Sequence, residues 1–449
     1  MTMSRSGAFA NKNWTWFQSE KVRPSSLAET PVFSLATRLS FLGYLVSLAL
    51  TQTVYGGPFM SVRWAMLAML VASSTADIIL VKNRGQFRIR PGNGQILTIY
   101  LLLTFGTVIY AENWMFSGMR WASHAIMIIV FMISLPQLVT LKQIQQAMAI
   151  FKYMMAFLVV ISWVVPSLQT HYDTGDLYQG AMGNSNAMGA IAFITAFFFM
   201  QNYITEKVPR ARYIAGALTV IAMMTVWKSG ARSAMIALIA GVVFLCYYYR
   251  KSMNGSVLAC ILAGSITMVS FPEVPKQIFH FAQKADPNGS VSGAMQSRIP
   301  VWTATYEGFR ARPLVGWGFG ADSNISRQWS VQLTSLGAAQ RDEVNDVLFM
   351  LEGGGILGLI SYLLSIWLVL KQCPNRLQRS LLQNFRREQE DEGTDMDLHH
   401  AHVAMYLLPV CLLILTQFDN TIFSAGNLIS VTFWLCAGSA AVLRHEIGA

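Results

Sequence analysis

The sequence predicts an all-α, polytopic membrane protein of about twelve transmembrane helices, with a long external loop that forms a small helical cap. Of the 449 residues, 53% are hydrophobic and only 12% are charged, about half the charged fraction of a soluble domain. The apolar residues form runs of membrane-spanning length, separated by short polar islands. This pattern excludes a soluble enzyme. The net charge of +10 is better explained by membrane topology than by nucleic-acid binding.

Twelve apolar segments, most of about 16 to 22 residues, are long enough to cross the hydrocarbon core of a bilayer. Residues 1–33 form a polar N-terminal tail without the apolar core of a cleavable signal peptide, so the first span must itself target the chain. The predicted spans are 34–54, 64–81, 95–111, 121–139, 147–166, 187–204, 213–227, 234–249, 256–271, 349–370, 403–418 and 427–443.

Counting Lys and Arg on alternate sides gives the orientation. With a cytoplasmic N-terminus, the inner segments hold twenty basic residues and the short outer loops hold four, which is the asymmetry that the positive-inside rule describes. Both termini are therefore predicted to be cytoplasmic. The chain then divides into a tail (1–33), helices one to nine (34–271), an external cap (272–348), helix ten (349–370), a cytoplasmic loop (371–402) and helices eleven and twelve with a short tail (403–449).

We expect no metal site and no disulfide framework. His399, His400 and His402 form a cluster with nearby acidic residues, but this cluster lies in the predicted cytoplasmic loop, where a solvated segment is the better interpretation. The five cysteines fall in spans or on the cytoplasmic side.

The cap is predicted to be helical and not disordered, because it is rich in aromatic residues. Ser297 is placed to cap a helix with Pro300 in its first turn and an apolar side that includes Trp302. Arg298 and Arg341 in this loop break the positive-inside pattern. Solvated loop charges are the simpler interpretation for the other arginines of the cap, whereas Arg298 is a candidate functional residue.

A second basic island is the short outer turn between the spans 213–227 and 234–249. It contains Lys228, Ser229 and Arg232. A guanidinium held in a turn this short can clamp phosphate oxygens with two parallel hydrogen bonds, and serine hydroxyls can assist. An anionic lipid head group is the ligand that suits this placement.

Two polar islands border later spans. Asn184 and Asn186 lie between glycines at a helix entry, where amides can bind anions or sugar hydroxyls, although a plain helix cap is the better interpretation of this segment taken alone. If the next island is helical from Asp342, that residue shares a face with Asn345 and Glu352. An ionisable residue entering the apolar zone, as Glu352 does, is a functional hypothesis by default, and pairing with an arginine for stability is the alternative.

These islands resemble the bacterial O-antigen ligase and polysaccharide polymerase superfamily of polytopic glycosyltransferases. The matching stretches occur in the family's order over about residues 180 to 370, namely Gly-Asn-Ser-Asn-Ala-Met-Gly (183–189), Ser-Gly-Ala-Arg-Ser (229–233), Ser-Arg-Ile-Pro-Val-Trp (297–302), Arg-Pro-Leu-Val-Gly-Trp-Gly-Phe-Gly (312–320), and Asn-Asp-Val-Leu with Glu-Gly-Gly-Gly-Ile-Leu-Gly-Leu (345–359).

The resemblance implies an oligosaccharide on a polyprenyl diphosphate as substrate, handled at the periplasmic face of the inner membrane without a cofactor. Arg232 and Arg298 match the family's diphosphate-binding arginines, and carboxylates such as Asp346 and Glu352 are candidates for the base. The resemblance also raises the expectation of a chain-length regulator and export machinery as partners. The substrate-binding candidates are Asn184, Asn186, Lys228, Ser229, Trp302, Arg341 and Asn345.

One departure from the family pattern bears on the reaction. Ligases of the family usually carry His directly before the Asn of the last motif, where this chain has Val344. This favours a repeat-unit polymerase for exopolysaccharide or O-antigen over an O-antigen ligase that transfers glycan to lipid A core. A flippase of lipid-linked oligosaccharide is the alternative from another class, but we find no repeated halves in the chain.

Overall fold

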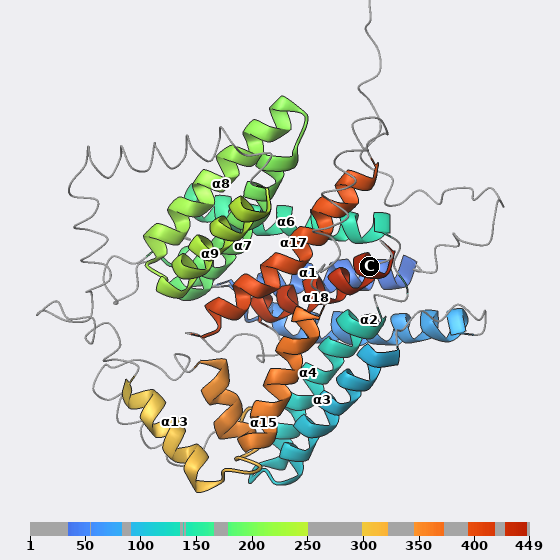
Figure 1. Cartoon of the computed structure of the whole chain (residues 1–449), viewed down its shortest axis with the longest axis vertical. Helices are drawn as coiled ribbons and strands as arrows, with labels where there is room; N and C mark the ends of the chain where they lie inside the picture. Colours follow the sequence, from blue (N-terminus) through green and yellow to red (C-terminus); the bar gives the residue numbers. More distant parts are fainter. Residues whose placement is uncertain are drawn as a thin grey trace, which may run out of the picture.

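A computed structural model describes residues 35–53, 55–82, 91–134, 138, 141–165, 178–249, 299–321, 345–371, 394–417 and 427–446. Within these ranges the fold is built from helices alone (Figure 1). They are α1 (Leu35–Thr51), α2 (Phe59–Lys82), α3 (Pro91–Ile109), α4 (Trp114–Ile128) with the π-helical turn η1 (Ile129–Ser134), α6 (Leu141–Val164), the 3₁₀ turn η3 (Gly180–Met182), α7 (Ser185–Thr205), α8 (Pro209–Ser229), α9 (Arg232–Tyr248), α13 (Ile299–Ala311), α15 (Asp346–Leu370), α17 (Thr394–Leu415) and α18 (Leu428–Glu446).

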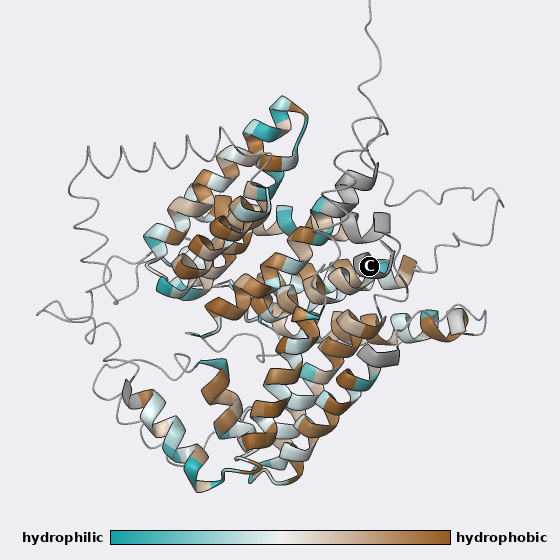
Figure 2. Cartoon of the chain, viewed as in Figure 1, coloured by the Kyte–Doolittle hydropathy of each residue, from teal (hydrophilic) through white to brown (hydrophobic). Residues whose placement is uncertain are grey.

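Eleven of the twelve predicted spans overlap these helices, although α4, α6 and α17 begin six to nine residues before the spans predicted for them. The predicted span 256–271 lies outside the described residues. Five described segments are long and apolar enough to cross a membrane, namely Phe59–Leu80, Trp114–Ser134, Gln146–Val164, Ser185–Thr205 and Asp346–Leu370. Five shorter apolar helices accompany them. Hydrophobic residues run along the helices, and hydrophilic residues gather at several helix ends and turns (Figure 2).

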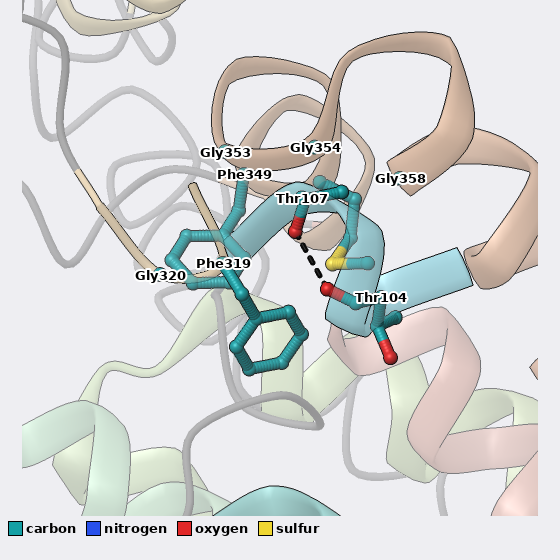
Figure 3. Close-up of a pocket in the computed structure, with 9 residues that line it drawn as sticks. Thr104, Thr107, Phe319, Gly320, Phe349, Gly353, Gly354 and Gly358 are labelled. Atoms are coloured by element: carbon teal, nitrogen blue, oxygen red, sulfur yellow. Dashed lines mark hydrogen bonds between the residues drawn. The ribbon is translucent and has the colours of Figure 1, made fainter. Parts of the chain in front are cut away.

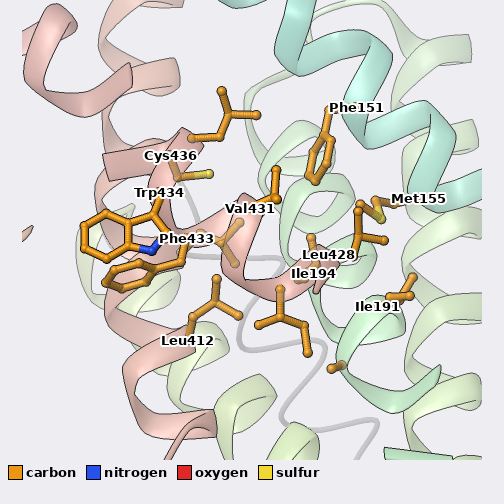
Figure 4. Close-up of a cluster of buried hydrophobic side chains, with 14 of the residues drawn as sticks. Phe151, Met155, Ile191, Ile194, Leu412, Leu428, Val431, Phe433, Trp434 and Cys436 are labelled. Atoms are coloured by element: carbon orange, nitrogen blue, oxygen red, sulfur yellow. The ribbon is translucent and has the colours of Figure 1, made fainter. Parts of the chain in front are cut away.

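Helix α7 lies at the centre of the core. Its residues from Met188 to Phe199 are buried on every side, as expected for a helix that is apolar all round. It packs against α6, α8, α9 and α17. Figure 4 shows this core, where side chains of α6 and α7 meet Leu412 of α17 and a run of α18 residues that includes Phe433 and Trp434.

Two predictions about local structure are wrong. The segment around His400 is helical and not a loop, because α17 begins at Thr394. There the Tyr249 hydroxyl lies 3.0 Å from Nδ1 of His400, and the His402 side chain is fully buried. The span predicted as one helix over 349–370 is broken at Gly355, which has φ 60° and ψ −148°. A Cβ atom on Gly358 would come within 2.2 Å of the Met350 carbonyl oxygen, so the two halves of α15 fold onto each other.

Candidate functional site

The break in α15 removes two hydrogen bonds from the helix. In a continuous helix the amides of Ile356 and Leu357 would donate to the carbonyl oxygens of Glu352 and Gly353. Gly355 adopts a backbone conformation that is essentially restricted to glycine, and both bonds are lost there. In a membrane-spanning segment such groups have to find other partners, because each unsatisfied group costs several kcal/mol.

The motif at 312–320 supplies all four missing partners. The Ile356 and Leu357 amides donate to the carbonyl oxygens of Pro313 and Leu314, at 2.8 and 3.3 Å. The freed carbonyls of Glu352 and Gly353 accept from the amides of Trp317 and Gly318, at 3.0 and 2.7 Å. We call this arrangement of 312–320 and the α15 break the backbone clasp.

Close backbone approach explains two glycines of the clasp. A Cβ atom on Gly316, where φ is 64°, would lie 2.5 Å from the Glu352 carbonyl oxygen. A Cβ atom on Gly355 would lie 2.5 Å from the Leu314 carbonyl carbon. Neither position can hold a larger residue without displacing backbone.

Residues near the N-terminal end of α4 bind the other side of the motif. The Ser117 hydroxyl donates to the Phe319 carbonyl oxygen at 3.0 Å, and the Arg120 guanidinium donates to that of Gly320 at 2.7 Å. Arg312 pairs with Glu112 at 3.0 Å. Because this pair is partly exposed, it adds about 0 to 1 kcal/mol at most. The motif is thereby fixed between α4 and α15.

Asn345, Asp346 and Glu352 lie along the first half of α15. Asn345 is the N-cap in extended conformation, and its side chain accepts from the Leu348 amide at 2.8 Å. Asn345 therefore precedes the helix and does not lie on the helical face that was predicted for it with Glu352. Asp342, the other predicted member of that face, lies outside the described residues. Asp346 and Glu352 are both buried, at 0% and 1% exposure. Trp302 belongs to α13, which packs against α15. Its neighbour Val301 contacts Leu348 and Phe349 in the first half of α15.

A buried polar cluster between α3 and α4 was not predicted from the sequence. The Tyr100 hydroxyl in α3 lies 2.7 Å from Nε2 of His124 in α4, and α3 packs against α15, which carries Asp346 and Tyr362. All four side chains are buried. The one available signal was a histidine inside the predicted span 121–139, which is unusual for a lipid-facing position.

A narrow crevice lies next to this cluster (Figure 3). Its walls are α3, α15 and the end of the clasp motif, and it is too tight to admit water. The residues that line it are Thr104, Thr107, Phe319, Gly320, Phe349, Met350, Gly353, Gly354 and Gly358. Glycines let α3 and α15 approach closely here, as small residues do between membrane helices.

The turn from Lys228 to Arg232 forms the second part of the site. Ser229 is fully buried, donates to the Val226 carbonyl oxygen at 2.8 Å and accepts from the Ala231 amide at 3.3 Å, so its hydroxyl shapes the turn. Lys228 is exposed, with Nζ 4.5 Å from the centroid of the Trp163 ring. Arg232 is half-buried and begins α9.

The N-terminus of α7 supports this turn. Asn184 is the N-cap, and its side chain accepts from the amides of Asn186 and Ala187, at 2.8 and 3.2 Å. The plain helix-cap interpretation therefore accounts for Asn184. One turn further along, Gly189 faces the turn so closely that a Cβ atom would lie 2.4 Å from Cβ of Ala231.

The candidate residues thus form two groups. Asn184, Asn186, Lys228, Ser229 and Arg232 lie around the α8–α9 turn, whereas Trp302, Asn345, Asp346 and Glu352 lie on α13 and around the first half of α15. Helices α9 and α15 both pack against α17. Arg298 and Arg341 lie outside the described residues, as does Val344. Within the described ranges, no three His, Cys, Asp or Glu side chains gather as a metal-ligand set.

No curated protein matches the chain significantly. A protein-family model described as O-antigen ligase matches residues 217–363, a segment that contains the α8–α9 turn, α13, the clasp motif and most of α15. This match confirms the resemblance seen in the sequence. Residues 217–363 of the chain are therefore similar to the O-antigen ligase family, which supports the resemblance to the O-antigen ligase and polysaccharide polymerase superfamily.

Proposed function

We propose that the protein is a polysaccharide polymerase of the bacterial inner membrane. It transfers a glycan from a polyprenyl-diphosphate-linked donor to a sugar hydroxyl on a second lipid-linked repeat unit, at the periplasmic face. The acceptor oxygen attacks the anomeric carbon of the donor sugar, and the polyprenyl diphosphate leaves with the electron pair of the broken bond. This chemistry needs cations beside the diphosphate and a base for the acceptor hydroxyl.

The family match and the two groups of residues support such a transferase. Arg232 lies in a turn held by Ser229 and by close packing on Gly189, and a guanidinium held in place suits a diphosphate. In the second group, Asp346 and Glu352 are buried carboxylates on a helix that the backbone clasp anchors. The orientation rests on the distribution of basic residues.

The observation that carries polymerase over ligase is Val344. Ligases of the family usually have a histidine there, and a valine can neither accept a proton nor position an acceptor by hydrogen bonding. The ligase remains the second candidate because the family model is itself described as O-antigen ligase.

Product size separates these functions. The purified, full-length protein is reconstituted in liposomes with polyprenyl-diphosphate-linked glycans extracted from host cells that lack its gene. A ladder of repeat-unit multiples without lipid A core supports the polymerase. Transfer only after lipid A core is added would establish a ligase, and no product under either condition would favour a flippase.

Three variants test the diphosphate site. Arg232→Ala and Arg298→Ala should each abolish the ladder. Arg310→Ala is the matched control, because Arg310 is exposed near the end of α13 and a solvated charge contributes little. Equal losses in all three variants would contradict a specific role for Arg232 and Arg298.

A further inference from the structure

A tryptophan from the end of α6 lies against the last turn of α8, beside the α8–α9 turn. The Trp163 indole N–H donates to Oγ1 of Thr225 at 2.7 Å, and Nζ of Lys228 lies 4.5 Å from the centroid of the same ring. Thr225 and Lys228 are three residues apart and therefore share one face of α8. The Thr225 hydroxyl donates to the Ile221 carbonyl oxygen at 2.8 Å, so its oxygen is still able to accept from the indole. Trp163 thus contacts the end of α8 at two points.

Tyr178, in the segment before α7, contacts both the Trp163 ring and the backbone of Lys228. The Tyr178 and Trp163 rings pack together, with centroids 5.4 Å apart. The Tyr178 hydroxyl donates to the Ser162 carbonyl oxygen, and the Tyr178 amide donates to the Lys228 carbonyl oxygen at 3.1 Å. One tyrosine therefore anchors the backbone of the lysine and the ring against which its ammonium group lies.

The Lys228 side chain is exposed, although its backbone and the ring beside it are held. An ammonium group over an indole face is attracted by the ring and can still donate hydrogen bonds to a ligand. Arg232 follows four residues later, at the first position of α9. The short turn between α8 and α9 therefore carries one cationic side chain from each helix.

We propose that Trp163 is a positioning residue that holds the Lys228 ammonium group at the α8–α9 turn, where Lys228 acts with Arg232 on the diphosphate of the donor. This inference rests on the proposed function. As the acceptor oxygen bonds to the anomeric carbon, the bond from that carbon to the diphosphate oxygen breaks, and this oxygen keeps the electron pair. The proton of the acceptor hydroxyl passes to a carboxylate, for which Asp346 and Glu352 are the candidates. The two cations stabilise the charge of the departing diphosphate and keep their own protons.

The two cations suit the two phosphates in different ways. A guanidinium clamps the oxygens of one phosphate with two parallel hydrogen bonds, whereas an ammonium group is a compact charge on a flexible stem. Restricting that stem before the substrate arrives lowers the entropic cost of binding, and the Trp163 ring provides this restriction. A lysine that only complements the dipole at the end of α8 would need no such ring. Trp163 lies before residues 217–363, so the family match assigns it no role.

Binding of polyprenyl diphosphate, the lipid that the reaction releases, tests the inference without requiring turnover. The purified, full-length protein is titrated with this lipid in detergent, and Kd is obtained from its thermal stabilisation. Lys228→Met keeps the length of the side chain and removes the charge, so it should raise Kd at least about tenfold, the effect of one lost charged hydrogen bond. Trp163→Leu should raise Kd about two- to fivefold, the strength of a partly exposed cation–π contact.

A double variant separates positioning from packing. If Trp163 acts through Lys228, adding Trp163→Leu to Lys228→Met should raise Kd no further. Trp163→Phe keeps an aromatic face and loses only the hydrogen bond to Thr225, so it should bind the lipid more tightly than Trp163→Leu does. Losses that multiply in the double variant would overturn the positioning role.

Two matched variants control for charge and for loss of an indole. Lys207→Met removes an exposed lysine just before the other end of α8. Trp227→Leu removes the exposed indole next to Lys228. Both should keep Kd within about twofold of the unaltered protein, as expected for exposed side chains outside the site. Equal losses in Lys207→Met and Lys228→Met would mean that the lipid responds to overall charge, and would overturn the inference.

Folding of each variant is checked by gel filtration and thermal unfolding. If Trp163→Leu does not fold, Trp163→Met replaces it, because methionine adapts to irregular apolar sites. If the unaltered protein binds polyprenyl diphosphate with these effects but forms no product with any acceptor, the proposed transferase fails and the binding site stands. If the protein elongates glycan and Lys228→Met binds and elongates equally well, the inference fails and the polymerase stands.

Discussion

The backbone amide of Trp317 donates a hydrogen bond of 3.0 Å to the carbonyl oxygen of Glu352. This bond joins the motif at 312–320 to the interior of α15, a helix that follows the motif in the sequence only after many residues. It is one of four that replace the helical bonds lost at Gly355. A membrane helix can be broken only where other protein groups satisfy its backbone, so the loop motif and the broken helix depend on each other.

Gly355→Ala tests this dependence. The substitution places a Cβ atom 2.5 Å from the Leu314 carbonyl carbon, at a φ and ψ that alanine avoids. We expect it to lower the free energy of unfolding by about 3 kcal/mol, from strained backbone and lost hydrogen bonds together. Thermal unfolding of the purified protein in detergent measures the loss.

Gly106→Ala is the control for that experiment. Gly106 lies in α3, and a Cβ atom there meets nothing within 4 Å. Its stability should match or slightly exceed that of the unaltered protein, because alanine favours a helix over glycine. Similar losses at the two positions would mean that the clasp does not hold α15.

The helices could be predicted from sequence, whereas the clasp could not. Hydropathy alone placed eleven helices, because a membrane helix satisfies its own backbone and needs only apolar length. Three of them, α4, α6 and α17, begin six to nine residues before the predicted spans. The run of glycines from 353 to 355 is equally compatible with a continuous helix packed closely on a neighbour. Only the backbone segment at 312–318, which hydrogen-bonds to the break, distinguishes a broken helix from a continuous one. This segment is distant in sequence.

The candidate site was likewise predicted in part. The motif residues around Arg232 and Asp346 are recognisable because their residue types and order carry the signal. Tyr100 and His124 lie outside the matched segment 217–363, and each alone is consistent with an ordinary apolar span. Their hydrogen bond depends on how α3 and α4 pack, which no local pattern specifies.

Gly189→Ala should disturb the α8–α9 turn. Its Cβ atom would lie 2.4 Å from Cβ of Ala231 and 2.7 Å from Oγ of Ser229. We expect elongation to fall at least about tenfold and stability by about 1 to 3 kcal/mol, as for other overpacked positions. Adding Ala231→Gly removes the first clash and should restore part of both. If it restores neither, displacement of the turn is not the cause.

Stability at alkaline pH should depend on Tyr178. Burial raises the pKa of Tyr178 to about 12, from 10.0 in the unfolded chain. Its contribution is complete below pH 10, and it is lost as pH rises from 10 to 12 because the unfolded chain ionises first. The difference in unfolding free energy between the protein and Tyr178→Phe should shrink by up to about 1.4 kcal/mol per pH unit in that window. If the unfolding free energies of the protein and of Tyr178→Phe change with pH in parallel between pH 10 and 12, this prediction is wrong.

Asn345 is both a helix cap and a candidate substrate ligand, and two substitutions distinguish these roles. Its side chain caps α15 by accepting from the Leu348 amide. Asn345→Ala should therefore cost about 1 kcal/mol of stability. Asn345→Asp keeps an acceptor oxygen at the same place, and the carboxylate also interacts favourably with the helix dipole. Thermal unfolding should then show Asn345→Asp at least as stable as the unaltered protein.

Activity in Asn345→Asp then decides the second role. The aspartate cannot donate a hydrogen bond as the amide NH₂ group can, so a substrate contact through that group is lost while the cap is kept. If Asn345 binds substrate, KM for the lipid-linked glycan should rise although stability is unchanged. If KM and kcat both stay at the values of the unaltered protein, Asn345 serves only as the cap that places Asp346 in the first turn of α15.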